Sequence, residues 1–147
     1  MASDLSGLTI KDEHLKRALE GREYLLVDGA TGTQMQERGL DALEAVPELL
    51  CKTHADDITA IHASYIAAGA EVITTNTFSA NRLKLGDKMS VEEAYRLAAD
   101  CARAAGAPYI AGDIGPTGSL LEPMGTLSFD EAYDIFAEQV RAAVAAE

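Results

Sequence analysis

Three short, mainly apolar runs lie along the chain, and each leads into polar or glycine-containing residues. They cover residues 24–27, 71–75 and 109–112. Runs this short do not support a helix, and apolar residues without polar alternation are typical of strands buried on both faces of a parallel sheet. The pattern therefore predicts three buried strands whose carboxyl ends carry polar loops.

Amphipathic segments with a helical period separate these strands. Residues 55–68 and 91–105 place apolar side chains at three- and four-residue intervals, and a third such segment begins at Ser128. Ser90 and Glu93 have the spacing of a capping box, and the same spacing recurs at the start of the third helix. In that third helix we expect one buried side, made of Phe129, Ala132, Tyr133, Phe136, Val140 and Val144.

The other segments are shorter or irregular, because proline, glycine and polar residues interrupt them. We expect short helices over residues 10–19 and 33–38 and a loop or irregular helix over residues 41–52. Residues 79–88 are expected to form a polar connection and residues 113–127 a long loop. Residues 1–21 are polar and mixed, so we predict an N-terminal extension of helical character. Residues 22–147 form the repeating part of the chain.

An internal repeat indicates the architecture. The sequence Ala-Ala-Gly-Ala occurs at residues 67–70 and 104–107, each time at the end of a predicted helix and before a predicted strand. Helix, glycine, strand and polar loop in this order form the βα repeat of a parallel α/β fold. A closed eight-stranded barrel needs about 250 residues. The chain therefore supplies about three of the eight units of a barrel, unless it forms a small open sheet.

Composition and charge narrow the classes of partner. The chain has 147 residues, 48% of them apolar, and a net charge of −12. A surface this acidic argues against nucleic acid or an anionic membrane as a partner. We find no apolar run of membrane-spanning length and no secretory signal pattern, and the two cysteines form neither a disulfide framework nor a metal motif. These features predict a cytoplasmic protein.

The polar residues at the predicted strand ends are the candidates for a ligand site. Asp28 and Gly29 follow the first strand, and Thr75, Asn76 and Thr77 follow the second. Parallel α/β folds place their ligands at the carboxyl ends of strands, although the same residue types also cap strands without binding anything. No glycine-rich nucleotide motif is present. His14, His62 and Cys101 are interpreted as packing or surface residues.

Seven segments, in order, match one known family. They are residues 26–33, 61–65, 68–70, 75–82, 112–118, 121–125 and 128–132. Together they resemble the homocysteine-binding (homocysteine S-methyltransferase) family, which includes the N-terminal module of cobalamin-dependent methionine synthase. Each motif alone is weak, and the ordered set is specific.

The resemblance implies a TIM (β/α)8 barrel, with the first three units present here, and methyl transfer to homocysteine to give methionine. It implies a zinc ion that holds the homocysteine sulfur as a thiolate, and a methyl donor such as methylcobalamin, methyltetrahydrofolate acting through cobalamin, a sulfonium or a betaine. By the family pattern, the amino-acid end of homocysteine is held by Asp28 and Gly29, and the pocket is lined by Thr75, Asn76, Thr77 and Phe78.

One departure from the family pattern concerns the metal. The family's zinc ligands are cysteines on later strands, and neither Cys51 nor Cys101 matches them. We therefore expect no metal ligand and no catalytic residue in this chain, which resembles the N-terminal part of such an enzyme and is expected to be inactive alone. Two other readings stay open: a non-catalytic α/β module that binds an anionic metabolite, and a half-barrel that self-associates through an open sheet edge.

Overall fold

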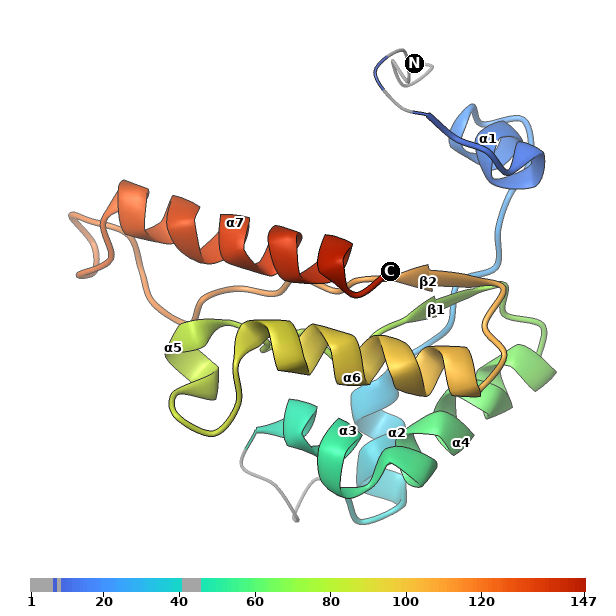
Figure 1. Cartoon of the computed structure of the whole chain (residues 1–147), viewed down its shortest axis with the longest axis horizontal. Helices are drawn as coiled ribbons and strands as arrows, with labels where there is room; N and C mark the ends of the chain where they lie inside the picture. The colour runs from blue at the N-terminus through green and yellow to red at the C-terminus, as the bar shows by residue number, and fades with distance from the viewer. Residues whose placement is uncertain (1–6, 8, 41–45) are drawn as a thin grey trace.

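The computed structural model describes residue 7 and residues 9–40 and 46–147. Two parallel strands, β1 (Val72–Thr74) and β2 (Tyr109–Ala111), lie at its centre, with Val72 opposite Tyr109 and Thr74 opposite Ala111. On the other side of β1, Val27 forms an isolated parallel bridge with Val72. The segment around Val27 and the two strands therefore lie side by side and parallel, with β1 in the middle (Figure 1).

Helices of different lengths connect and cover these strands. In chain order the helices are α1 (Glu13–Leu19), α2 (Thr31–Glu37), the 3₁₀ turn η1 (Pro47–Leu49), α3 (Leu50–Thr53), α4 (Ala55–Ala67), α5 (Arg82–Leu85), α6 (Val91–Ala104) and α7 (Phe129–Ala145). The predicted order of long helices and strands is confirmed from α4 to α7. The short helix α5 was expected to be an irregular connection.

Local sequence explains where the long helices begin. The Ser90 hydroxyl accepts a hydrogen bond from the Glu93 amide at 3.1 Å, and the Ser128 hydroxyl accepts one from the Glu131 amide at 3.2 Å. Each bond satisfies an amide that the first turn of a helix leaves without a partner. Both predicted caps are confirmed.

Helix α6 lies between α7 and the α3–α4 layer and contributes buried residues to the core on both sides (Figure 1). Its buried side carries small residues such as Ala94 and Ala98 together with the large ring of Tyr95. Ile58 and Ile61 of α4 are fully buried and belong to the same core cluster as Ala98 of α6. The small residues let neighbouring helices approach closely, which places α6 over the sheet.

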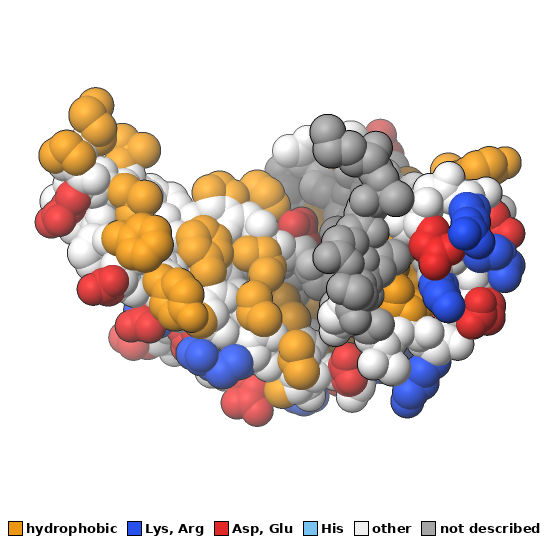
Figure 2. All heavy atoms as spheres, turned by 90° about the horizontal axis from the view of Figure 1, so that it is seen from above, with side chains coloured by type: hydrophobic (Ala, Val, Ile, Leu, Met, Phe, Trp, Pro, Cys, Tyr) orange, Lys and Arg blue, Asp and Glu red, His pale blue; other side chains and the backbone are white. Residues whose placement is uncertain are grey.

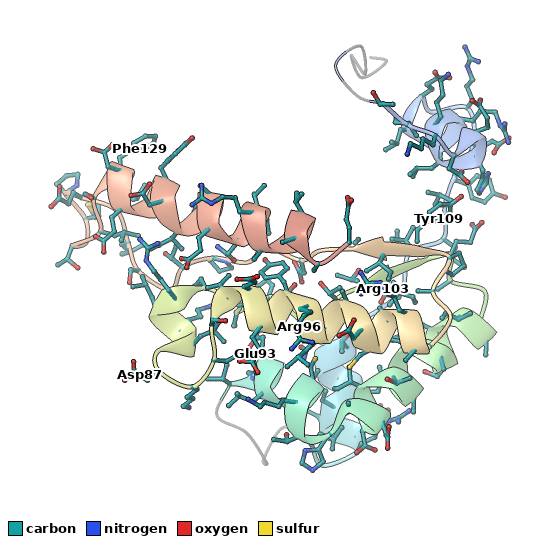
Figure 3. The ribbon with its side chains drawn as sticks, in the orientation of Figure 1. Asp87, Glu93, Arg96, Arg103, Tyr109 and Phe129 are labelled. Carbon is teal, nitrogen blue, oxygen red and sulfur yellow. The ribbon has the colours of Figure 1, made fainter. Side chains whose placement is uncertain are left out.

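The expected buried side of α7 is wrong. Besides Ala132, which was expected inside, the helix buries Ile135, Gln139 and Ala142. Of the side chains expected inside, Phe129 is 73% exposed and Val144 is 63% exposed, and only Ala132 is buried. Figure 2 shows apolar side chains gathered on the face seen from above, and Figure 3 shows Phe129 at the start of α7, away from α6. The alanine-rich side of α7 fits against α6, so the larger apolar side faces outward.

The first predicted strand also differs from expectation. Residues 24–27 form a bridge but no regular strand, and Leu26 and Val27 are 52% and 54% exposed. A strand is buried on both faces only where helices cover both sides of the sheet. Among the described residues, no helix covers the outer side of this segment.

The N-terminal extension contains a helix, as predicted, which lies at the amino ends of the strands. The His14 ring contacts Glu23 through Nδ1 at 2.6 Å and Glu71 through Nε2 at 3.1 Å. The Tyr109 hydroxyl, at the start of β2, donates to Asp12 at 2.8 Å (Figure 3). These polar contacts place α1 at the opposite end of the sheet from the loops that follow the strands.

Part of one predicted loop, residues 41–45, lies outside the described residues. The rest of that segment, residues 46–52, contains η1 and most of α3. Within the described ranges, we find no helix with the length and hydrophobicity needed to cross a membrane.

Candidate functional site

The carboxyl ends of the three strand segments meet at a cavity of about 450 Å³. Its wall includes Asp28 after the first segment, residues 74–76 at the end of β1, and Asp113 after β2. The start of α2 and the turn at Pro47–Leu50 complete it. Three segments far apart in sequence therefore meet as the parallel arrangement requires.

Thr74 fixes the carboxylate of Asp28. The Thr74 amide donates to Asp28 Oδ2 at 3.0 Å, and the Thr74 hydroxyl donates to Asp28 Oδ1 at 2.8 Å. The Asp28 amide in turn donates to the Val72 carbonyl at 3.0 Å, next to the Val27 bridge. Hydrogen bonds to a carboxylate are stronger than those between neutral groups. Asp28 therefore enters the cavity in one orientation.

Gly29 lies against an aromatic ring of α4. A side chain at this position would meet the Tyr65 ring at 3.0 Å, and the Tyr65 hydroxyl donates to the Ala30 carbonyl at 3.2 Å. The contact holds the turn at Gly29 close to α4. A larger residue there would displace the turn or the ring.

Thr77 does not line the cavity, in contrast to Thr75, Asn76 and Phe78. It is fully buried, and its hydroxyl donates to the Asp113 carbonyl at 2.8 Å. The Thr75 hydroxyl lies 2.8 Å from it and is the donor in that pair, because the Thr77 proton is already engaged. Thr77 thus joins the loop after β1 to the loop after β2 from behind the cavity wall.

The buried ring of Tyr95 on α6 supports the same junction. Its hydroxyl donates to the Asp113 carbonyl at 2.8 Å. Burial raises the pKa of Tyr95 to about 12, so the hydroxyl stays protonated and remains a donor at neutral pH. Asp113 lines the cavity, and burial raises the pKa of its carboxyl.

Asn76 and Phe78 form other parts of the wall. The Asn76 amide donates to the Pro47 carbonyl at 2.8 Å, which ties the loop after β1 to the turn at residues 47–50. Phe78 is 55% exposed, and the Lys84 ammonium lies 5.8 Å from the centre of its ring. Asn76 therefore has a structural bond, and the Phe78 ring is open to solvent.

Several lining residues are not among the site residues predicted from the sequence, and Thr74, Glu48 and Asp113 are the polar ones that matter most for the site. Thr74 was counted within the strand, and Glu48 within a loop around Pro47. A single acidic residue between apolar Val46 and Leu49 was the only local signal for Glu48. Nothing local distinguished Thr74 from an ordinary strand threonine.

No group of three or more histidine, cysteine or acidic side chains is arranged to hold a metal in the part of the chain that the structure describes. Cys51 and Cys101 are buried in the core, and hydrogen bonding to Cys101, followed by burial, raises the pKa of Cys51. His62 is buried on the packing side of α4, as expected, but neither ring nitrogen has a partner among the described residues. Burial lowers the pKa of His62, so its ring is neutral at pH 7.

Comparisons with known proteins agree with this geometry. The family model of homocysteine S-methyltransferase matches residues 25–147. The chain is 30% identical over 151 residues to methionine synthase of Mycobacterium tuberculosis, covering 89% of this chain and 13% of that protein. It is 32% identical over 133 residues to methionine synthase of Mycobacterium leprae, covering 80% of this chain and 11% of that protein.

The fold is also found in a solved structure. The homocysteine methyltransferase MmuM from Escherichia coli, in its oxidized form, superposes with a TM-score of 0.74 at 20% identity, over 92% of this chain and 54% of that one. The chain thus spans about half of this neighbour and a much smaller share of the two methionine synthases. On the family match across most of its length, this chain belongs to the homocysteine S-methyltransferase family.

Proposed function

We propose that this chain forms the homocysteine-binding part of an enzyme that transfers a methyl group to the homocysteine thiol, giving methionine. The observation that carries the proposal is the cavity at the strand ends, lined by Asp28, Gly29, Thr75, Asn76 and Phe78, in a member of this family. In the reaction the sulfur loses its proton and gains the methyl group that the donor releases.

The residues of the chain suit the amino-acid end of homocysteine. Asp28, held by Thr74, offers a carboxylate to the ammonium group. The backbone at Gly29 offers its amide to the carboxylate, since no side chain lies between it and the cavity. Met35 and Leu50 provide an apolar surface for the methylene carbons.

The family implies a zinc ion that would hold the sulfur as a thiolate and keep it nucleophilic at neutral pH. The described residues do not fit such an ion, because they bring together no set of three ligands. We therefore assign no reaction step to a metal held by this chain. Its proposed role is to bind and orient homocysteine.

The charge of the cavity favours this proposal over binding of an anionic metabolite. Asp28, Glu48 and Asp113 line the cavity, and no lysine, arginine or histidine is among the lining residues that the structure describes. An anion without a cationic group would meet like charges there, whereas an amino acid brings an ammonium group.

Titration calorimetry of the 147-residue chain with L-homocysteine tests the proposal. We expect binding, and a loss of affinity of about tenfold or more in Asp28→Ala, since a hydrogen bond to a charged group contributes about 1.5–3 kcal/mol. Asp87→Asn, which lies outside the cavity lining, removes the same charge and serves as the control. Absence of homocysteine binding, or equal binding by Asp28→Ala, would refute the proposal.

A further inference from the structure

Glu48 is a buried acid with one oxygen that the fold does not use. It lies in the turn η1 and is 1% exposed. Its Oε1 accepts a hydrogen bond from the Ser79 amide at 2.5 Å, whereas Oε2 is buried with no partner among the described residues. Buried carboxylate oxygens without partners are costly, so they call for an explanation.

The surroundings of Glu48 do not neutralise its charge. The charges of Lys84 of α5 and Asp113 after β2 act on the Glu48 carboxyl. The charge of Glu48 acts in turn on Cys51 of α3 and Tyr95 of α6. Lys84 is the only cation in this set, and its ammonium lies 3.4 Å from the Ser79 hydroxyl. Burial raises the pKa of Glu48, and the Ser79 amide and the Lys84 charge oppose that shift without cancelling it.

Glu48 also lines the strand-end cavity, and it comes from a different segment of the chain than the loops that carry Asp28 and Asp113. Asn76 holds the turn at this position through its bond to the Pro47 carbonyl. The turn is thus anchored on both sides of the acid, by Asn76 at Pro47 and by the Ser79 amide at Glu48 itself. Glu48 is thus a fixed residue of the cavity lining whose second carboxyl oxygen has no partner among the described residues, which favours a ligand contact over a packing role.

We propose that Glu48 is a specificity-determining residue whose free oxygen accepts a hydrogen bond from the positively charged group of the bound ligand. For homocysteine this group is the ammonium, so the inference rests on the proposed function and extends its set of binding residues. A cation supplies both the missing hydrogen-bond donor and the missing counter-charge. Ligands without a cation leave Glu48 buried and unpaired, and the site rejects them.

The test compares three thiols by titration calorimetry with the 147-residue chain. The probes are L-homocysteine, 3-aminopropane-1-thiol, which keeps the ammonium without the carboxylate, and 4-mercaptobutanoate, which keeps the carboxylate without the ammonium. Glu48→Gln preserves the size of the side chain and an oxygen for the Ser79 amide while removing the charge. Glu92→Gln on the exposed surface of α6 makes the same change of charge outside the cavity and is the control.

We expect Glu48→Gln to weaken binding of both ammonium-bearing thiols by about 10- to 100-fold and to leave 4-mercaptobutanoate binding unchanged or stronger. Glu92→Gln should bind all three as the unmodified chain does. Equal affinity of Glu48→Gln and the unmodified chain for the two amines would overturn the inference and leave the proposed function intact. Equal weakening of all three thiols would also overturn it, because it would indicate a structural role.

The remaining outcomes separate the two proposals. Glu48-dependent binding of 3-aminopropane-1-thiol without binding of homocysteine would support the cation contact and refute the proposed function. Binding of none of the three thiols would refute both. Circular dichroism of each variant establishes that it is folded, and Glu48→Asp, which restores the charge on a shorter side chain, should recover part of the preference for amines.

Discussion

Replacing Thr74 by valine removes one of the two hydrogen bonds that hold the Asp28 carboxylate and changes little else. Valine has the shape of threonine and suits a strand. The hydroxyl bond to Oδ1 at 2.8 Å is lost, while the amide bond to Oδ2 at 3.0 Å remains. A hydrogen bond to a charged group contributes about 1.5–3 kcal/mol when it is well buried. Asp28 and Thr74 are both only half-buried, so we expect about 1 kcal/mol.

A double-mutant cycle isolates this interaction from other effects of each change. Urea unfolding, followed by circular dichroism at pH 7, gives the free energy of unfolding of the unmodified chain, Thr74→Val, Asp28→Ala and the double variant. Thr74→Val should lower that free energy by about 1 kcal/mol more when Asp28 is present than when it is alanine. With a urea dependence of about 2 kcal/mol per molar, this corresponds to a difference in midpoint of about 0.5 M. Thr74→Ser, which keeps the hydroxyl, should retain most of the coupling.

The reasoning fails if Thr74→Val has the same cost with and without Asp28. That result would mean that the two side chains do not interact in solution and that Asp28 is free to turn. The same set of variants then bears on function, because an Asp28 carboxylate that is not fixed would bind an ammonium group less selectively.

Four further predictions concern the packing, the glycine contacts, the pH response and the metal. Ile135→Ala should lower the free energy of unfolding by about 2–5 kcal/mol because Ile135 is fully buried. Val140→Ala, on the exposed side of α7, should change that free energy by less than about 1 kcal/mol. The opposite order of the two variants in urea unfolding would show that α7 is turned the other way. Gly115→Ala should cost about 1–3 kcal/mol because the added carbon overlaps the backbone of the loop after β1, while Gly32→Ala meets nothing within 4 Å and should not destabilise the chain in the same assay. Hydrogen bonds to the Glu23 and Glu71 carboxylates raise the pKa of His14, so its stabilising effect is complete below the unfolded pKa of about 6.5 and is lost as the pH rises through the higher folded value. Hydrogen-exchange protection of α1 should therefore fall as the pH rises above about 6.5, and His14→Ala should remove this dependence. Zinc titration of the isolated chain should show no tight one-to-one binding, and stoichiometric binding that competes with a chelator would contradict this.

Local sequence was sufficient for the order of the long helices and strands from α4 to α7 and for the residues at which α6 and α7 begin. The capping serines at residues 90 and 128 were identified correctly because the hydrogen bonds that start a helix join residues three apart. The positions of Asp28, Thr75 and Asn76 at the strand ends were likewise readable, since parallel strands present their carboxyl ends at one edge. Their roles toward homocysteine stay predictions.

The tertiary structure alone decided which side of α7 is buried and which residues complete the cavity. Periodicity marked an apolar side of α7, but the alanine-rich surface of α6 accepts the side with Ala132 and Ala142 and leaves the larger residues exposed. Thr74 meets Asp28 across 46 residues of sequence, and Glu48 meets the Ser79 amide across 31. The neighbours of a residue in sequence largely specify its backbone conformation. Its contact partners across the sheet depend on packing between distant segments, and a local sequence pattern does not contain that information.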